Sequence, residues 1–115
     1  MKEEITVSGL IKVIESGKGK EIRLSAYQVT RLFGVFEATI IANVKAIIKS
    51  GVLIPNTYGS LVQSGKSFLP EVYDLEMIIA LAFRINSAET AELRKWVIGK
   101  ISRVNIVKMN YFQLN

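Results

Sequence analysis

Apolar residues recur at helical spacing in two adjacent segments, residues 25–33 and 35–50. The face of the first segment is formed by Val29, Leu32 and Phe33. The second segment has a longer face, formed by Val35, Ile40, Val44, Ile47 and Ile48, and it ends at Ser50-Gly51. Ser25 stands where an N-cap belongs, and Gly34 stands where a sharp bend needs a positive φ. The pattern predicts a helix-turn-helix at about 25–50, with an ordinary helical hairpin as the alternative.

The segments that flank this motif predict a short helix and several strands. Residues 6–16 have helical spacing, and residues 21–24 alternate as a half-buried strand does. Two apolar runs at about 57–73 are separated by the Ser64-Gly65 turn and predict a β-hairpin, in which Pro70 restricts one strand to an edge. A hairpin directly after a helix-turn-helix has the position of a wing.

The segment at about 74–101 predicts two further helices. Asp74 is the expected N-cap of the first, which is apolar nearly all round and is predicted to be the central core helix. Ser87 is the expected N-cap of the second, whose predicted buried face consists of Leu93, Trp96, Val97 and Ile101. The tail, residues 102–115, lacks a helical period and fits a terminal strand or a segment that orders on a partner.

Together these elements predict one domain over residues 1–115. Its class is α+β, a small winged helix-turn-helix-like domain with four to five helices and a β-hairpin. A chain of 115 residues is long enough to bury one modest core.

Composition narrows the chemistry that the chain offers. It contains no cysteine and no histidine, which removes the commonest metal ligands and the commonest general base. Its acids, nine glutamates and Asp74, have no spacing typical of a metal site or an acid/base pair. Gly65-Lys66-Ser67 matches the end of a P-loop, but Ser60 stands at the place of the first glycine. We therefore expect no catalytic activity, no metal and no cofactor.

Charge and hydropathy bear on partner and location. No apolar run approaches the roughly twenty residues that a membrane helix needs, and the first residues lack the apolar stretch of a secretory signal. We expect a cytoplasmic protein without a membrane contact. The net charge of +5 favours a polyanionic partner.

Two sets of residues carry a family resemblance that spans about residues 22–101. The downstream set is Tyr73, Leu75, Ile78, Ile79, Phe83, Arg84, Ile85, Asn86, Ser87, Leu93, Arg94, Trp96 and Val97. The upstream set is Gln28, Leu32, Phe33, Gly34, Val35, Thr39 and Ile40. The downstream set resembles the signature of RhuM-like virulence-associated proteins and of Bro-N phage antirepressor domains. The upstream set is similar to the helix-turn-helix that precedes this signature in RhuM-like proteins, in the same order and at comparable spacing. The resemblance implies a DNA-binding regulatory module of phage or mobile-element type.

The first functional hypothesis is therefore binding of duplex DNA, with the helix at 37–49 in the major groove. The candidate DNA-binding residues are Arg31, Glu37, Ile41, Lys45, Lys49 and Lys66. Of these, the lysines and the arginine would contact phosphates, so that much of the affinity would be independent of sequence.

The second hypothesis is a protein-interaction or dimerisation module, because the expected outward face of the same helix is poor in base-reading side chains. We expect that face to consist of Phe36, Glu37, Ala38, Ile41 and Lys45. The candidate contact residues are Phe36, Ile41, Tyr111 and Phe112, with a second copy or a regulator protein as partner.

Three side chains of the downstream set are expected to stabilise the fold. Trp96 is predicted to pack in the core, and Arg84 and Arg94 to pair with Glu92, Asp74 or helix carbonyls.

Overall fold

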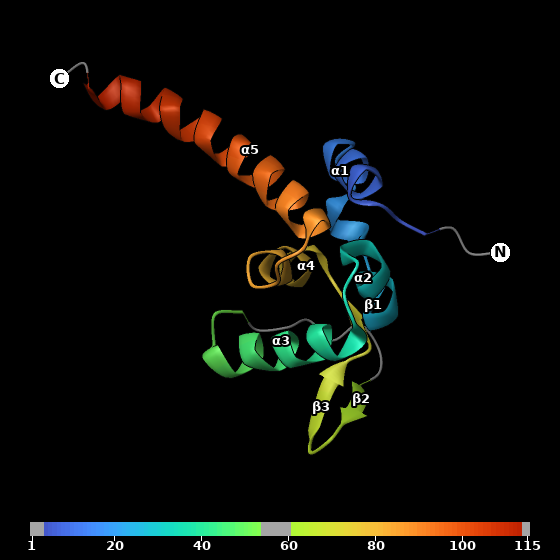
Figure 1. Cartoon of the computed structure of the whole chain (residues 1–115). Helices are drawn as coiled ribbons and strands as arrows, with labels where there is room; N and C mark the ends of the chain where they lie inside the picture. Colours follow the sequence, from blue (N-terminus) through green and yellow to red (C-terminus); the bar gives the residue numbers. More distant parts are fainter. Residues whose placement is uncertain (1–3, 54–60, 114–115) are drawn as a thin grey trace.

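The computed structural model describes residues 4–53 and 61–113, with side chains to residue 103. Within these residues the chain has an α+β fold of five α-helices and two antiparallel pairs of strands (Figure 1). In chain order these are α1 (Val7–Glu15), a 3-10 turn (Gly19–Glu21), β1 (Leu24–Ser25), α2 (Ala26–Phe33), α3 (Glu37–Ser50), β2 (Leu61–Ser64), β3 (Ser67–Pro70), β4 (Val72–Tyr73), α4 (Leu75–Ala82) and α5 (Ala88–Gln113). This is the arrangement of a small winged helix-turn-helix-like domain.

Local signals fix the bend between α2 and α3. The Ser25 hydroxyl accepts a hydrogen bond from the Gln28 amide at 3.2 Å, and the Gln28 side chain accepts one from the Ser25 amide at 2.8 Å. This reciprocal capping box satisfies donors that the first turn leaves unpaired. Gly34 ends α2 with φ 66°, as predicted, and its amide donates to the Thr30 carbonyl. The helix-turn-helix geometry therefore follows from residues close in sequence.

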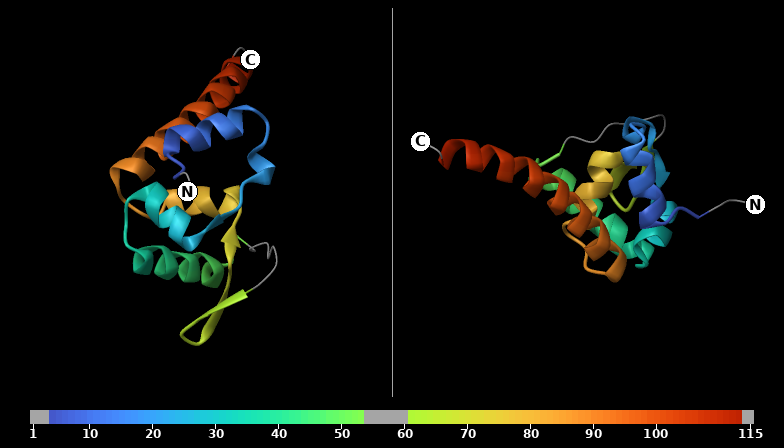
Figure 2. Two further views of the ribbon diagram at one scale, coloured as in Figure 1. Left: turned by 90° about the vertical axis from the view of Figure 1, so that its right-hand side faces the viewer. Right: turned by 90° about the horizontal axis from the view of Figure 1, so that it is seen from above.

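Helix α4 is the centre of the core, as predicted. Met77, Ile78 and Leu81 are essentially inaccessible to solvent, and α4 packs between α3 and α5 (Figure 2). The Asp74 carboxylate caps it by accepting from the Met77 amide. The helix ends at Ala82, earlier than predicted, because the following residues turn toward α5.

The hairpin forms at the predicted place but is shorter. In β2 and β3 the pairs run from Leu61 with Pro70 to Ser64 with Ser67, and a strand rather than a P-loop helix follows the turn. Gly65 opens the two-residue turn with φ 60°, which a type II′ hairpin requires. Val72 and Tyr73, predicted as part of this hairpin, form β4 and pair with β1 instead. The first hairpin residues, 57–60, lie outside the described residues.

Helix α5 corrects the prediction for the tail. It continues to Gln113, so the predicted terminal strand is wrong. Residues 102–113 contain neither proline nor glycine, and extending an existing helix needs no new nucleation. The helix projects away from the other elements (Figure 1).

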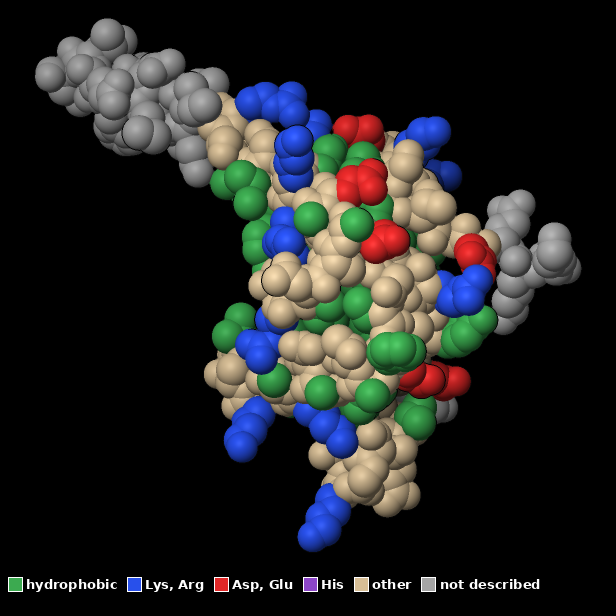
Figure 3. Space-filling view, viewed as in Figure 1, with side chains coloured by type: hydrophobic (Ala, Val, Ile, Leu, Met, Phe, Trp, Pro, Cys, Tyr) green, Lys and Arg blue, Asp and Glu red, His purple; other side chains and the backbone are tan. Residues whose placement is uncertain are grey.

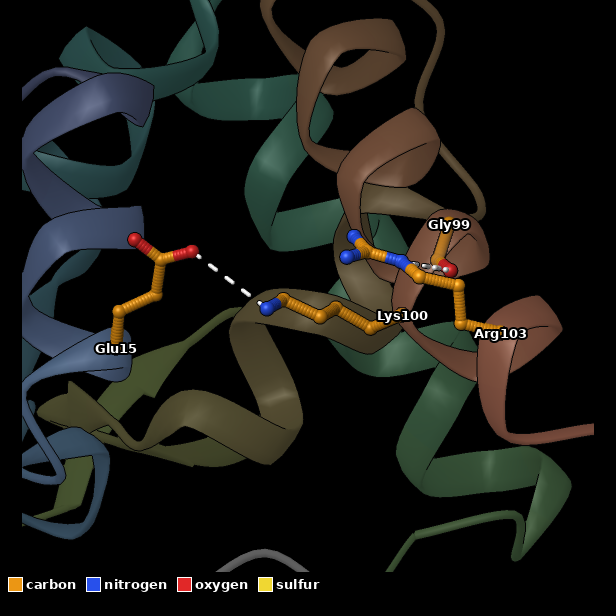
Figure 4. Close-up of polar contacts among 4 residues, drawn as sticks. All are labelled: Glu15, Gly99, Lys100 and Arg103. Atoms are coloured by element: carbon orange, nitrogen blue, oxygen red, sulfur yellow. Dashed lines mark hydrogen bonds and ion pairs between the residues drawn. The ribbon is translucent and has the colours of Figure 1, made fainter. Parts of the chain in front are cut away.

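The first half of α5 is attached to the body by polar and apolar contacts. The Ser87 hydroxyl caps it by accepting from the Thr90 amide at 3.1 Å, as predicted. Lys100 pairs with Glu15 of α1 at 3.7 Å (Figure 4), and its ammonium lies 5.7 Å from the centre of the Trp96 ring. Ile101, predicted to be buried, is 54% exposed, because α5 has begun to leave the body there.

Two threonines give a matched test of this fold. Thr90 Oγ1 donates to the Ile85 carbonyl and accepts from the Ser87 amide, whereas the buried Thr30 Oγ1 has no partner among the described residues. We expect Thr90→Val to lower the free energy of unfolding by about 1–3 kcal/mol, because it leaves the Ser87 amide without its acceptor and removes one of the two hydrogen bonds to the Ile85 carbonyl. Thr30→Val should leave that free energy unchanged or raise it. Urea unfolding measures both, and equal losses would contradict the assignment.

Candidate nucleic-acid interface

The rotation of α3 about its axis decides which side chains it presents. Ile40, Val44 and Ile47 are buried, so the opposite side faces solvent. The exposed side chains there recur at helical spacing and are those of Ala38, Ala42 and Lys49, with the half-buried Lys45 at their edge. The outward face of α3 is therefore small and basic.

Three of the predicted cations lie on one side of the molecule. Lys66 is exposed at the tip of the hairpin. The Nζ of Lys45 lies 3.8 Å from the position that a Cβ atom would take at Gly65, so this ammonium reaches from α3 to the hairpin turn. Lys49 follows one turn later along α3. Figure 3 shows Lys and Arg side chains that project below α3 and from the tip of the hairpin.

Arg31 and Glu37 are placed differently from this group. Arg31 forms an ion pair with Glu4, which precedes α1, rather than with a residue of α3 or the hairpin. Glu37 is exposed in the first turn of α3, where a carboxylate favours the helix N-terminus. A carboxylate at this edge would repel phosphates.

Ile41 does not face outward, and that prediction is wrong. It is half-buried and packs against the core, because it follows the buried Ile40 on α3 and its side chain faces the hairpin. It lines a groove of about 240 Å³ between α2, α3 and the hairpin. The apolar lining includes Tyr27, Val62 and Leu69, and two carboxylates, those of Glu37 and Glu71, lie at the same groove.

Phe36 is the most exposed large apolar side chain among the described residues, at 84%. It occupies the N-cap position of α3, and its side chain makes no capping hydrogen bond. Tyr27, 62% exposed, belongs to the adjacent groove. Tyr111 and Phe112 belong to the helical backbone of α5, but their side chains lie outside the described part of the chain.

The signature arginines have two different roles. Arg94 donates to the carbonyls of Ala82 and Ile85 at 2.7 and 2.9 Å, which confirms the expected pairing with backbone carbonyls. Arg84 is exposed and donates from Nε to the Asn43 side chain of α3. Sequence reasoning missed this contact, because the two residues are 41 positions apart and neither predicts the other. Trp96 is half-buried and packs against the core, as expected.

Among the described residues no group of three or more acidic side chains could hold a metal ion. In the same residues no helix is long and apolar enough to cross a membrane. Comparisons of the chain with protein-family models, curated proteins and solved structures give no match.

Tyr73 provides a pH test of the groove. Burial raises the pKa of its phenol above the usual value, and the nearby Glu37 carboxylate raises that pKa further. The unfolded chain therefore ionises first, so Tyr73 lowers stability only as pH rises above about 10 toward the folded pKa. We expect Tyr73→Phe to remove a component of the tyrosinate absorbance titration whose pKa lies above the usual value, and Glu37→Gln to lower that pKa. Tyr27→Phe is the exposed control, and loss of the same component in it would contradict the assignment.

Proposed function

We propose that this chain is a DNA-binding regulatory module of phage or mobile-element type, with α3 in the major groove of a duplex. The observation that carries the proposal is the common position of Lys45, Lys49 and Lys66 on one side of α3 and the hairpin. Ammonium groups so placed can contact successive phosphates while the helix occupies the groove. The family resemblance of the motif and the signature points to the same function.

The outward face of α3 further defines the mode of binding. Ala38 and Ala42 place only methyl groups there, so the helix backbone can approach the floor of the groove. Alanine can contact the thymine methyl but cannot read donor and acceptor patterns on base edges. The affinity would therefore come mainly from phosphates, with weak preference for thymine-containing sites.

Neutralising the three lysines tests the proposal. The triple variant Lys45→Gln, Lys49→Gln, Lys66→Gln should bind a short fluorescent duplex more weakly. The slope of log K against log salt should fall by about 0.9 for each lysine removed, because each releases one counterion fewer. Fluorescence anisotropy between about 50 and 200 mM salt measures both.

A matched control removes the same net charge from other surfaces. Lys12, Lys18 and Lys95 are exposed on α1, the following turn and α5. Their triple glutamine variant should keep the wild-type slope. If both triple variants lose affinity equally, α3 and the hairpin are not the interface. If the wild type does not bind duplex at the lowest salt, the function itself is wrong.

A second candidate function, self-association, is favoured by the exposure of Phe36 beside the groove. Aromatic side chains this exposed are more typical of protein contacts than of a free surface. Phe36, Tyr27 and the groove residue Ile41 would form the contact.

Phe36→Ser separates the role of this side chain in association from its effect on folding. Serine at the N-cap can accept from amides of the first turn of α3, so the free energy of unfolding should rise by about 0.5–1 kcal/mol. In sedimentation equilibrium the wild type should be a dimer and this variant a monomer. Val52→Ser, at a residue also highly exposed but beyond the end of α3, is the control. A monomeric wild type would end this candidate.

A further inference from the structure

Arg84 lies in the turn between α4 and α5 and reaches α3 from the body of the domain. Its Nε donates to Asn43 Oδ1 at 3.1 Å, and its side chain is exposed. Asn43 Nδ2 in turn donates to the Thr39 carbonyl at 2.8 Å. The Asn43 amide is thus held with its oxygen toward Arg84. Because the guanidinium is planar, fixing Nε also fixes the direction of the two η nitrogens.

The bond to Asn43 uses one of the five N–H donors of Arg84. Within residues 4–53 and 61–103, its η nitrogens have no protein acceptor. The backbone carbonyls of the same turn are bound by Arg94 instead. Arg94 therefore already stabilises the turn, and an exposed, oriented Arg84 fork has the geometry that binds a phosphate with two parallel hydrogen bonds.

The position of this fork relative to α3 suggests which phosphate it meets. Lys45 and Asn43 are two residues apart, which places them about 200° apart around a helix of 3.6 residues per turn. Lys45 reaches the hairpin, so Asn43 and Arg84 lie on the other flank of α3. Ala42 faces outward between them. A major groove about 12 Å wide is bordered by one phosphate backbone on each side of such a helix.

We propose that Arg84 is a second phosphate-binding point, which holds a phosphodiester of one strand while Lys45 and Lys66 hold the other. Asn43 is its positioning residue. The inference rests on the proposed DNA-binding function and deepens it, because it identifies a contact from the signature region on the opposite flank of α3. Arg84 on one flank, with Lys45 and Lys66 on the other, would then clamp the two backbones and fix the helix in the groove.

The test compares four variants for binding to the same fluorescent duplex over a salt series. Arg84→Gln should weaken binding about 5- to 20-fold and lower the salt slope by about 0.9, as expected for one phosphate contact. Arg84→Lys should keep the slope but lose several-fold in affinity, since it keeps the charge and loses the fork. Asn43→Ala should also keep the slope and lose several-fold in affinity, because the charge stays but its orientation does not.

Arg103→Gln is the matched control. Arg103 is also exposed and also uses its Nε for one hydrogen bond, to the Gly99 carbonyl at 3.4 Å (Figure 4), but it lies on α5. It should bind as the wild type does. Circular dichroism melting of every variant establishes that the fold is kept.

The outcomes separate this inference from the proposed function. If Arg84→Gln binds with the same affinity and salt slope as the Arg103→Gln control, Arg84 does not contact a phosphate and this inference is wrong. If the lysine triple variant has a lower affinity and a lower slope in the same experiment, the proposed DNA binding stands. If the slope falls in Asn43→Ala, Asn43 is more than a positioning residue and the assignment of roles is wrong. A wild type that binds no duplex overturns both proposals.

Discussion

Burial of one stripe of α3 is the constraint on which the candidate interface depends. Ile40, Val44 and Ile47 pack into the core against α4, and this fixes the rotation of α3 about its own axis. The burial of three such side chains contributes several kcal/mol, with about 1.5–3 kcal/mol for each. A rotation that exposed them would cost that stabilisation. The small basic face and the two flanks of α3 all follow from this packing.

Part-buried and exposed cationic side chains have different partners in this domain. Arg94 is part-buried and binds carbonyls, so it replaces lost water contacts with protein ones. The cations on α3 and the hairpin stay in contact with water, which the proposed function would have them exchange for a phosphate. Glu37 and Glu71 lie on the hairpin side of α3, which makes the groove acidic beside a basic surface. The two candidate partners, DNA and a second protein chain, would therefore meet different chemistry on neighbouring surfaces.

Elements that depend on local chemistry were predictable from the sequence, and those that depend on distant partners were not. The caps at Ser25 and Asp74 and the bend at Gly34 follow from residues within one turn. The pairing of β4 with β1 and the bond from Arg84 to Asn43 join distant segments, and no periodicity encodes them. In the candidate site, the position of Lys45, Lys49 and Lys66 on one side followed from the order of helix and hairpin. Arg31, predicted with them, pairs with Glu4 instead. The inward turn of Ile41 did not, because it depends on where the hairpin packs.

The length of α5 has a mechanical consequence. Its 26 residues span about 39 Å, and its base is tied by Arg94 to the turn that carries Arg84. Contacts with the body hold the helix as far as about residue 101, so the projecting part, residues 102–113, spans about 18 Å. A tilt of about 10° where this part leaves the body would move its far end by about 3 Å, the product of this length and the angle.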